Sequence, residues 1–395
     1  MNFTERWIWQ SPDWTDFQWQ DELVQPRLRD TRLKLGVLLG KASVTASRVS
    51  DSSNDGSFHD SEQSLDNLLA NIIASSAIEN EQLNVESVRS SLAKHLGLSS
   101  NQPYPTSDRS EGLAVMMLDA LQNQDAVLTV QRLFQWHEWL FPSPKEDEWS
   151  SQTIIVGKLR GDEPMQVVSG RLDRQTVHFE APPRDQLEKA LDKFITWFNQ
   201  SGQQSDFDPL LRAAITHFWF VTLHPFDDGN GRITRALTDM ALAQADSQSI
   251  RLYAMSVAIL ENRKSYYQIL EQSQSFDSAN DLTPWLLWFF DTLDASINNA
   301  MNIIDGTLLK TQFWQRHHDS GLSVEQVKVL NRLLDGAGVE GKERGFVDGI
   351  SASQYQKVAK VSKATATRHL ADLLEKGCIE KLAAGGRSTR YCIKS

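Results

Sequence analysis

The sequence predicts a mainly α-helical protein with one β-hairpin near its middle and a second hairpin close to its C-terminal end. Two observations support this fold class, and a third sets the C-terminal part apart from the rest of the chain. Apolar residues recur at helical spacing through most of the chain. Short strand-favouring runs bounded by turn residues occur around residues 165–179 and 378–393. Charge is unevenly distributed, because residues 350–395 carry nine Lys or Arg and three Asp or Glu, whereas the whole chain has a net charge of -11.

Composition indicates a protein of several domains without membrane-spanning segments. With 395 residues the chain is long enough for two or three domains with substantial cores. No apolar stretch approaches the ~20 residues that a membrane-spanning helix needs. Residues 1–20 lack the basic start and apolar core of a signal peptide, so we expect a cytoplasmic location. Cys378 and Cys392 are too few for a disulfide framework or a structural zinc site.

The N-terminal part, residues 1–98, is expected to form a helical domain. It opens with four tryptophans, which we interpret as packing residues, and continues with leucines at helical spacing. The segment Ser43–Ser64 is rich in serine and aspartate, and this composition predicts a mobile loop. Residues 65–98 then predict two helices with a break near Asn84.

A second domain, residues 99–305, follows as the expected core. Asp208 and Pro209 are an N-cap and a first helical residue, and the helix that they begin leads to His224. Further helical patterns cover residues 128–141, 187–198, 233–245, 259–273 and 283–300.

The densest group of polar residues is the segment HPFDDGNGRITR, from His224 to Arg235. A histidine is neutral and basic near pH 7, so His224 is the candidate general base. Asp228 is a hard oxygen ligand that suits Mg²⁺ together with phosphate oxygens, and Asp227 is the alternative ligand. Because a second helix begins at the two glycines, the free backbone N–H groups of this turn can bind an anion.

Two arginines extend this phosphate site. Arg232 and Arg235 share one face of the second helix, and planar guanidinium groups suit phosphate oxygens. Asn230 can donate to the same oxygens. The group favours phosphoryl or nucleotidyl transfer, since these reactions depend on positioning and charge neutralisation. The alternative interpretation is a glycine-rich turn between helices with solvated charges.

The segment also resembles the Fic motif HPFx(D/E)GNGRxxR at every defined position, and the sequence is identified as a member of the Fic family. The resemblance implies a Fic-type helical core that transfers AMP from ATP to a Ser, Thr or Tyr hydroxyl of a target protein or of itself, releasing pyrophosphate. It implies that His224 is the base, that Asp228 binds Mg²⁺, and that Arg232 and Arg235 contact the polyphosphate. The implied anion site comprises Gly229, Asn230 and Gly231.

A second segment, SSAIEN at residues 75–80, resembles the inhibitory pattern (S/T)xxxE(G/N) of the same family, with Ser75, Glu79 and Asn80 at the defined positions. A Glu79 carboxylate paired with Arg235 would occupy the place of the ATP γ-phosphate and hold the enzyme off. In some relatives this glutamate also serves the removal of AMP from a modified target. For the six residues alone, an ordinary helix with a solvated glutamate is the competing interpretation.

The predicted middle hairpin, formed by residues 165–169 and 175–179, corresponds to the flap of Fic proteins. By resemblance the flap clamps the target backbone by strand addition. The expected docking edge comprises Val177, His178, Phe179 and Glu180. Asn262, Tyr266 and Tyr267 resemble positions that line the nucleotide base pocket, whereas His137 is expected to pack and to form hydrogen bonds rather than to catalyse.

The C-terminal part, residues 320–395, predicts a helix-turn-helix followed by a hairpin, which is the pattern of a winged helix. Its recognition helix would present Lys363, Thr365, Thr367 and Arg368, and its wing would carry Arg387 and Arg390. DNA binding and a role in dimerisation or target docking are equally compatible with this unit.

The leading hypothesis is therefore an auto-inhibited, nucleotide-binding protein adenylyltransferase with Mg²⁺ as cofactor, ATP as substrate and a target protein as partner. A homodimer is possible by resemblance. The first alternative is a DNA-binding regulator whose Fic domain senses nucleotide or is vestigial. The second is a Fic transferase that uses UTP, GTP or CDP-choline, because nothing in the phosphate motif reads the base.

Overall fold

The computed structural model describes residues 6–50, 56–98, 104–142, 154–171, 174–204, 207–246, 252–278, 280–336, 346, 349–382 and 389–394. The chain divides into two compact units. The first comprises Met1–Val37 and Ser50–Ile297, and the second comprises Leu38–Val49 and Asn298–Ser395. Helices dominate both units, so the mainly α-helical prediction is confirmed. None of the described helices is long and apolar enough to cross a membrane.

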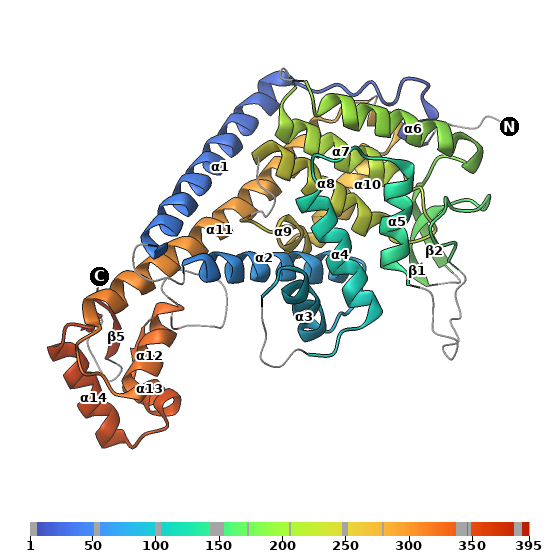
Figure 1. The fold of residues 1–395 in the computed structure, drawn as a ribbon. Helices are drawn as coiled ribbons and strands as arrows, with labels where there is room; N and C mark the ends of the chain where they lie inside the picture. The colour runs from blue at the N-terminus through green and yellow to red at the C-terminus, as the bar shows by residue number, and fades with distance from the viewer. Residues whose placement is uncertain are drawn as a thin grey trace. The chain divides into compact units, whose positions relative to one another are not determined.

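Two helices form the centre of the first unit, α7 (Pro209–Leu223) and α8 (Asn230–Asp246), and they lie side by side (Figure 1). Every residue of α7 from Leu210 to Leu223 is buried, as expected for a helix that is apolar on nearly all sides. Its N-cap is the predicted Asp208, whose carboxylate accepts hydrogen bonds from the amides of Leu210 and Leu211 at 2.8 and 3.2 Å.

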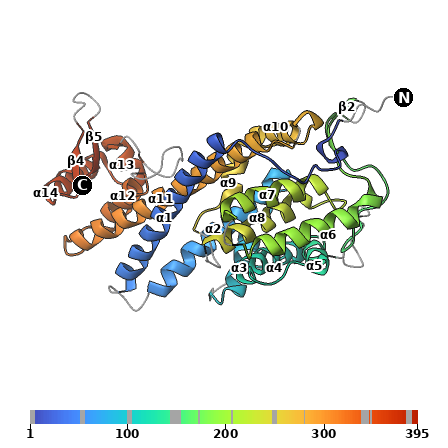
Figure 2. The ribbon, with the colours of Figure 1, turned by 90° about the horizontal axis from the view of Figure 1, so that it is seen from above.

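Five further helices surround this pair. They are α2 (Gly56–Ile78), α3 (Val85–His95), α4 (Asp108–Gln122), α5 (Val130–Leu140) and α6 (Arg184–Ser201). The helices α3, α4 and α5 lie next to one another in both views (Figures 1 and 2). The side chains of Asn84, Ser107 and Thr129 cap α3, α4 and α5, which explains where each helix begins.

The loop predicted for Ser43–Ser64 is wrong over most of its length. The helix α1 (Asp21–Ser50) continues to Ser50, and α2 already begins at Gly56. Serine and aspartate lower helix stability by only a few tenths of a kcal/mol each, so composition alone does not end a helix. Residues 51–55 lie outside the described part of the chain.

The helix predicted for residues 259–273 is interrupted once. Its place is taken by α9 (Met255–Glu261) and α10 (Arg263–Ser273), which meet at Asn262 with φ -113° and ψ 30°. Asparagine competes with the helical backbone for hydrogen bonds and therefore favours helix ends. The remaining helical elements of this unit are the short 3-10 turns η1 (Ile8–Gln10) and η2 (Phe276–Ser278) and the first part of α11 (Thr283–His317).

The predicted middle hairpin is confirmed. Strand β1 (Gln166–Arg171) pairs antiparallel with β2 (Arg174–Glu180), with Gln166 opposite Glu180 and an irregularity between Val167 and Val168. Residues 172–173 at its tip are outside the described part. Its base packs against the N-terminal segment, where Trp7 meets Phe179 edge to face at a centroid distance of 5.5 Å.

The second unit has its own core. The helices α12 (Val324–Leu334), α13 (Ala352–Ala359) and α14 (Lys363–Glu375) accompany a three-stranded sheet of order β3–β5–β4, formed by β3 (Ile350–Ser351), β4 (Ile379–Lys381) and β5 (Arg390–Ile393). Ser323, Ser351 and Ser362 cap the three helices. The winged helix remains an interpretation of these elements, because residues 383–388, including Arg387 of the predicted wing, lie outside the described part.

Candidate active site

The turn between α7 and α8 holds His224 in an unusual backbone conformation. His224 ends α7 with φ 48°, in the left-handed region that costs most L-residues about 1–2 kcal/mol. The buried Arg160 fixes this turn. Its Nε donates to the carbonyl of His224 at 2.9 Å, and its guanidinium also donates to the carbonyl of Pro182. Its backbone amide donates to the carbonyl of Pro225 at 3.0 Å. The strained turn is therefore held by a clamp that sequence reasoning missed.

The other end of the turn is held by Asn230. Its amide group donates to the carbonyl of Phe226 at 2.7 Å, and its side-chain oxygen accepts from the amide of Phe226 at 2.9 Å. The prediction that this side chain donates to phosphate oxygens therefore needs correction for the state described here. The side chain is committed to the turn, so Asn230 can face an anion only through its backbone N–H at the start of α8.

The imidazole of His224 is oriented for proton transfer. Its Nδ1 lies 3.1 Å from the carbonyl of Val221, so Nδ1 carries the proton and Nε2 is the basic nitrogen. Burial lowers the pKa of His224, and the charge of Arg160 lowers it further against the opposing influence of the Val221 carbonyl, Glu79 and Asp228. The ring is consequently neutral near pH 7 and able to accept a proton.

The N-terminus of α8 lies beside this histidine. The first backbone N–H groups of a helix have no intrahelical partner and attract anions. Gly229 has φ 80°, and a Cβ there would lie 2.9 Å from the ring of Phe141. At Gly231 a Cβ would collide with Oε1 of Glu79. The absence of a side chain at Gly229 makes room for the Phe141 ring, and its absence at Gly231 gives an anionic group direct access to the helix end, which in this state is the Glu79 carboxylate.

The predicted pair between Glu79 and Arg235 is present, and it forms within one chain. Arg235 Nη2 lies 2.8 Å from Glu79 Oε1 and 2.8 Å from the carbonyl of Ser75, while Nε donates to the Ser75 hydroxyl at 2.8 Å. Burial alone would raise the pKa of Glu79, but the charge and hydrogen bond of Arg235 hold it below its usual value. Glu79 is therefore ionised and paired.

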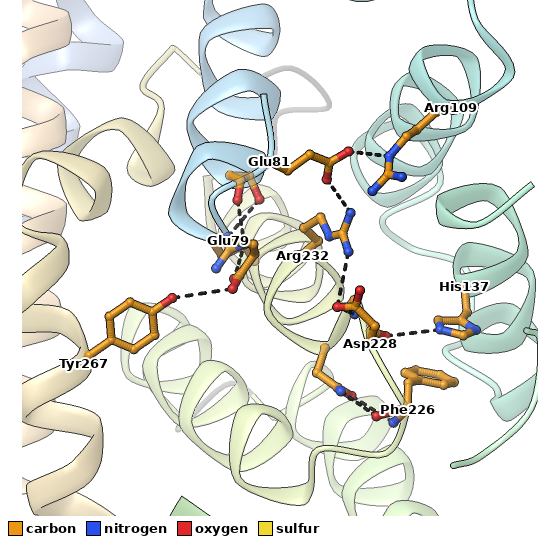
Figure 3. A network of polar contacts seen from close by, with 12 residues as sticks. Glu79, Glu81, Arg109, His137, Phe226, Asp228, Arg232 and Tyr267 are labelled. Atoms are coloured by element: carbon orange, nitrogen blue, oxygen red, sulfur yellow. Dashed lines mark hydrogen bonds and ion pairs between the residues drawn. The ribbon is translucent and has the colours of Figure 1, made fainter. Parts of the chain in front are cut away.

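The backbone explains why asparagine follows this glutamate. Asn80 has φ 60°, its amide donates to the carbonyl of Ala77, and the amide of Glu81 donates to the carbonyl of Ser76, both at 3.0 Å. This is a Schellman turn at the end of α2, which needs glycine or asparagine at its left-handed position. The Asn80 side chain also accepts a hydrogen bond from Arg263 at 2.7 Å. The turn directs Glu79 and Glu81 toward α8 (Figure 3).

Arg232, the other motif arginine, is bound by a second carboxylate. Its Nη1 lies 2.6 Å from Glu81 Oε2, and its Nη2 lies 3.5 Å from Asp228 Oδ1. Arg109 of α4 also pairs with Glu81, through Oε1 (Figure 3). Sequence reasoning missed Glu81 and Arg109, although the position of Glu81 directly after the Schellman residue was a usable signal.

Asp228 suits the predicted role of Mg²⁺ ligand better than Asp227 does. Its side chain is 54% exposed, and its Oδ1 accepts a hydrogen bond from the amide of Gly229 at 2.5 Å, whereas Asp227 is half-buried and accepts one from the amide of Ile155 at 2.9 Å. The described residues contain no group of three His, Cys, Asp or Glu side chains that could hold a metal alone. A single exposed carboxylate suits Mg²⁺, which completes its shell with phosphate oxygens and water. His137 only supports the turn, as predicted, because its Nε2 donates to the Asp228 carbonyl at 3.1 Å.

The predicted docking edge of the flap is partly occupied. The carbonyl of Val177 accepts a hydrogen bond from Arg6 at 3.1 Å, and that of Glu180 accepts from the indole of Trp9 at 2.6 Å. His178 pairs with Glu271 at 3.0 Å. Two main-chain acceptors that were expected to be free for a target peptide are thus bound by the N-terminal segment. The sequence of the hairpin itself gives no sign of these contacts.

The predicted base-pocket residues separate in the structure. The hydroxyl of Tyr267 faces the inhibitory turn, 3.2 Å from the carbonyl of Ile78 and 3.4 Å from Glu79 Oε2 (Figure 3). Tyr266 is buried and bonded to His217 at 2.9 Å, which makes it a core residue. Asn262 is exposed at the junction of α9 and α10. Tyr267 therefore lies next to the Glu79 carboxylate, and Tyr266 lies next to the Arg235 guanidinium on the core side.

Comparisons with known proteins agree with this geometry. Residues 7–98 match a family described as "Domain of unknown function (DUF4172)", and residues 127–242 match the Fic/DOC family. The chain is 27% identical over 154 residues to protein adenylyltransferase fic-1 of Caenorhabditis briggsae, an alignment that covers 38% of this chain and 27% of that protein. It is 32% identical over 100 residues to protein adenylyltransferase Fic of Nematostella vectensis, covering 25% and 22%. The chain thus spans only about a quarter of the length of these relatives.

A solved structure shares the fold. A Fic family protein from Desulfovibrio desulfuricans G20 superposes with a TM-score of 0.50 at 19% identity, covering 93% of this chain and 96% of that one. The segment that matches the Fic/DOC family includes α7, the turn at His224 and α8 as far as Leu242. The chain therefore contains a Fic domain within residues 127–242.

Proposed function

We propose that the protein is an auto-inhibited protein adenylyltransferase that transfers AMP from ATP to a hydroxyl group of a target protein or of itself. The observation that carries the proposal is the arrangement at the start of α8, where a neutral histidine, a bare helix N-terminus and two buried arginines meet. Curated relatives named protein adenylyltransferase support the same reaction class.

In this mechanism His224 Nε2 accepts the proton of the attacking hydroxyl group, whose oxygen forms a bond to the α-phosphorus. The bond between this phosphorus and the oxygen that leads to the β-phosphorus breaks, and pyrophosphate leaves. The α8 N-terminus, Arg232 and Arg235 bind the phosphate oxygens and balance the charge that develops on them. Positioning and charge neutralisation by fixed groups supply most of the catalysis.

Asp228 would hold Mg²⁺ against the phosphates. A bound Mg²⁺ would neutralise charge on the pyrophosphate leaving group. The carbonyl of Asp228 is fixed by His137, while its carboxylate stays exposed. Asp228→Asn is expected to abolish the Mg²⁺ dependence of transfer together with most activity.

Glu79 would inhibit the enzyme by occupying the anion site. Its carboxylate covers the Gly231 backbone and pairs with Arg235, so ATP cannot place its γ-phosphate there. The test compares Glu79→Gly protein with the wild type and with Glu79→Gly/His224→Ala, using labelled ATP, GTP, UTP and CDP-choline and mass spectrometry of the product. We expect AMP transfer by Glu79→Gly alone. No gain over wild type would refute inhibition by Glu79, and preference for another nucleotide would refute the adenylyl assignment.

Removal of AMP from a modified target is a second proposed activity of the same site. Ionised Glu79 lies beside the anion site and next to Tyr267, where it could orient a water molecule. Wild-type protein should then release AMP from target that has been modified by Glu79→Gly protein, and Glu79→Gly should not. Equal release by both variants would argue against this role.

A DNA-binding role for the second unit is a separate candidate. Lys363, Thr367 and Arg368 are exposed on α14, and residues 350–395 carry a net charge of +6. We expect the whole chain to bind duplex DNA with an affinity that falls as salt rises, and Lys363→Ala/Arg368→Ala to weaken it. Binding that is absent at low salt on every duplex tested would leave dimerisation or target docking as the function of this unit.

A further inference from the structure

The turn that carries Glu79 brings a second carboxylate to the same site. We propose that Glu81 is a second, independent inhibitory residue, and that Arg109 is a third phosphate-binding arginine that Glu81 holds in the closed state. The proposal rests on the proposed nucleotide transfer and names two further residues of its anion site. Glu81 would neutralise Arg232 and Arg109, and both arginines would bind the polyphosphate once the turn withdraws.

The geometry of Glu81 is that of a bridging carboxylate. Its Oε2 lies 2.6 Å from Arg232 Nη1, and its Oε1 pairs with Arg109 Nε (Figure 3). The Glu81 side chain is 17% exposed and that of Arg232 is 3% exposed, so the contact is screened little by solvent. If Glu81 leaves, two neighbouring guanidinium groups lose their shared counter-ion beside a helix N-terminus. Such a group of cations favours an anion with several oxygens.

Unused donors indicate where that anion binds. Within the described part of the chain, Arg232 Nε and Arg235 Nη1 are buried without a hydrogen-bond acceptor. Buried guanidinium donors without a partner are uncommon and unfavourable, so they mark a position for an acceptor that the closed state does not supply. Arg235 Nη1 lies 3.1 Å from the position of a Cβ on Gly231, which places it at the N-terminus of α8.

The charges explain why one glutamate is not enough. Three arginines, Arg109, Arg232 and Arg235, face two glutamates, Glu79 and Glu81, from a single turn. Removing Glu79 frees Arg235, but Glu81 still neutralises Arg232 and still anchors the turn over the site. Glu79→Gly protein is therefore only partly open, and its affinity for ATP is limited by Glu81.

The first experiment measures ATP binding by isothermal titration calorimetry on the full chain carrying Glu79→Gly. Adding Glu81→Ala should tighten ATP binding about tenfold, which corresponds to one charge interaction at a partly buried site. The matched control is Glu86→Ala, which makes the same charge change at an exposed position in the first turn of α3. Glu81→Gln, which keeps the side-chain shape, should act in the same direction. Equal affinity with and without Glu81 would overturn the proposal.

A second arm tests Arg109. In Glu79→Gly/Glu81→Ala protein, Arg109→Ala should weaken ATP binding about tenfold and Arg109→Lys less, while adenosine binding stays unchanged because adenosine has no phosphate. Arg89→Ala, which removes an arginine that pairs with Asp66 on the surface, is the control. An unchanged affinity for ATP in Arg109→Ala protein would refute its role.

The two proposals fail in different ways. If Glu81 and Arg109 change ATP affinity as expected but no variant transfers a nucleotide, the phosphate site is as inferred and the transferase function is wrong. If Glu79→Gly protein transfers AMP and neither Glu81 nor Arg109 affects ATP binding, only the roles proposed for Glu81 and Arg109 are wrong. Thermal unfolding of each variant, followed by circular dichroism, verifies that the differences arise in folded protein.

Discussion

The left-handed conformation of Asn80 offers a way to open the inhibitory turn without changing any residue that contacts the nucleotide. We expect Asn80→Val to raise auto-modification. Asn80 has φ 60°, which asparagine tolerates and a β-branched residue does not. The change places roughly 1–2 kcal/mol of strain on the closed turn. That energy corresponds to a shift of about 5- to 30-fold in the ratio of open to closed molecules.

The strain acts on the two hydrogen bonds that define the turn, from the amides of Asn80 and Glu81 to the carbonyls of Ala77 and Ser76. Because the carboxylates of Glu79 and Glu81 both depend on this turn, both should withdraw together. The assay is the initial rate of auto-modification with labelled ATP, compared with wild type and with Glu79→Gly. The rate of Asn80→Val protein should lie between the rates of wild type and Glu79→Gly protein. Asn80→Val protein should also bind ATP more tightly than wild type does.

Two matched variants separate backbone strain from other effects. Asn80→Gly removes the side-chain bond to Arg263 but relieves the left-handed strain, so it should remain inhibited. Lys360→Val introduces similar strain at the end of α13, where Lys360 has φ 54°, and should not activate the enzyme. If Asn80→Val is folded and no more active than wild type, or if Asn80→Gly is equally activated, the turn does not control the site as argued.

Three further predictions concern the site and the flap. Burial and the charge of Arg160 lower the pKa of His224, so its neutral form persists at pH values below the ordinary histidine pKa of 6.5. As the pH falls, kcat/KM of Glu79→Gly protein should therefore decrease only below pH 6.5. A half-maximal kcat/KM at or above pH 6.5 would contradict this. Arg160→Ala leaves the carbonyls of His224 and Pro182 without their donor, which costs about 1–3 kcal/mol for each carbonyl. Both Tm and kcat should therefore decrease, while the affinity for ATP stays the same. An unchanged kcat would show that Arg160 does not position the base. Trp7→Ala removes the buried ring that packs on Phe179 and should lower the free energy of unfolding by about 3–5 kcal/mol. Modification of a target should decrease, while ATP binding is kept. Equal loss of both would indicate general unfolding instead.

Local signals in the sequence predicted much of the fold. The cap at Asp208 and Pro209, the hairpin around residues 165–179 and the start of α8 at the glycines depend on contacts within a few residues, and all three appear where expected. The failed loop at Ser43–Ser64 shows the limit of composition as evidence, because weak helix formers continue a helix once it has begun.

The candidate site was predictable only in part. The pairing of Glu79 with Arg235 joins residues 156 positions apart, and only resemblance to a family connected them. Arg160 lies in a segment without helical or strand periodicity, so nothing local indicated that it would clamp the carbonyl of His224. The contacts of Arg6 and Trp9 with the flap likewise depend on how distant segments pack. Such long-range partners follow from the fold and not from the local sequence.

In the proposed mechanism, one electrostatic requirement connects inhibition with catalysis. Arg235 is 2% exposed, and a guanidinium group buried to this extent needs an anion nearby, since an uncompensated buried charge costs several kcal/mol. In the closed state Glu79 meets this requirement, and its depressed pKa shows that the demand is mutual. In the proposed mechanism the nucleotide γ-phosphate meets it by taking the place of the carboxylate. If both ligands satisfy one buried cation, as proposed, we expect the turn and ATP to compete directly, so that a change that weakens the turn strengthens nucleotide binding by a comparable free energy.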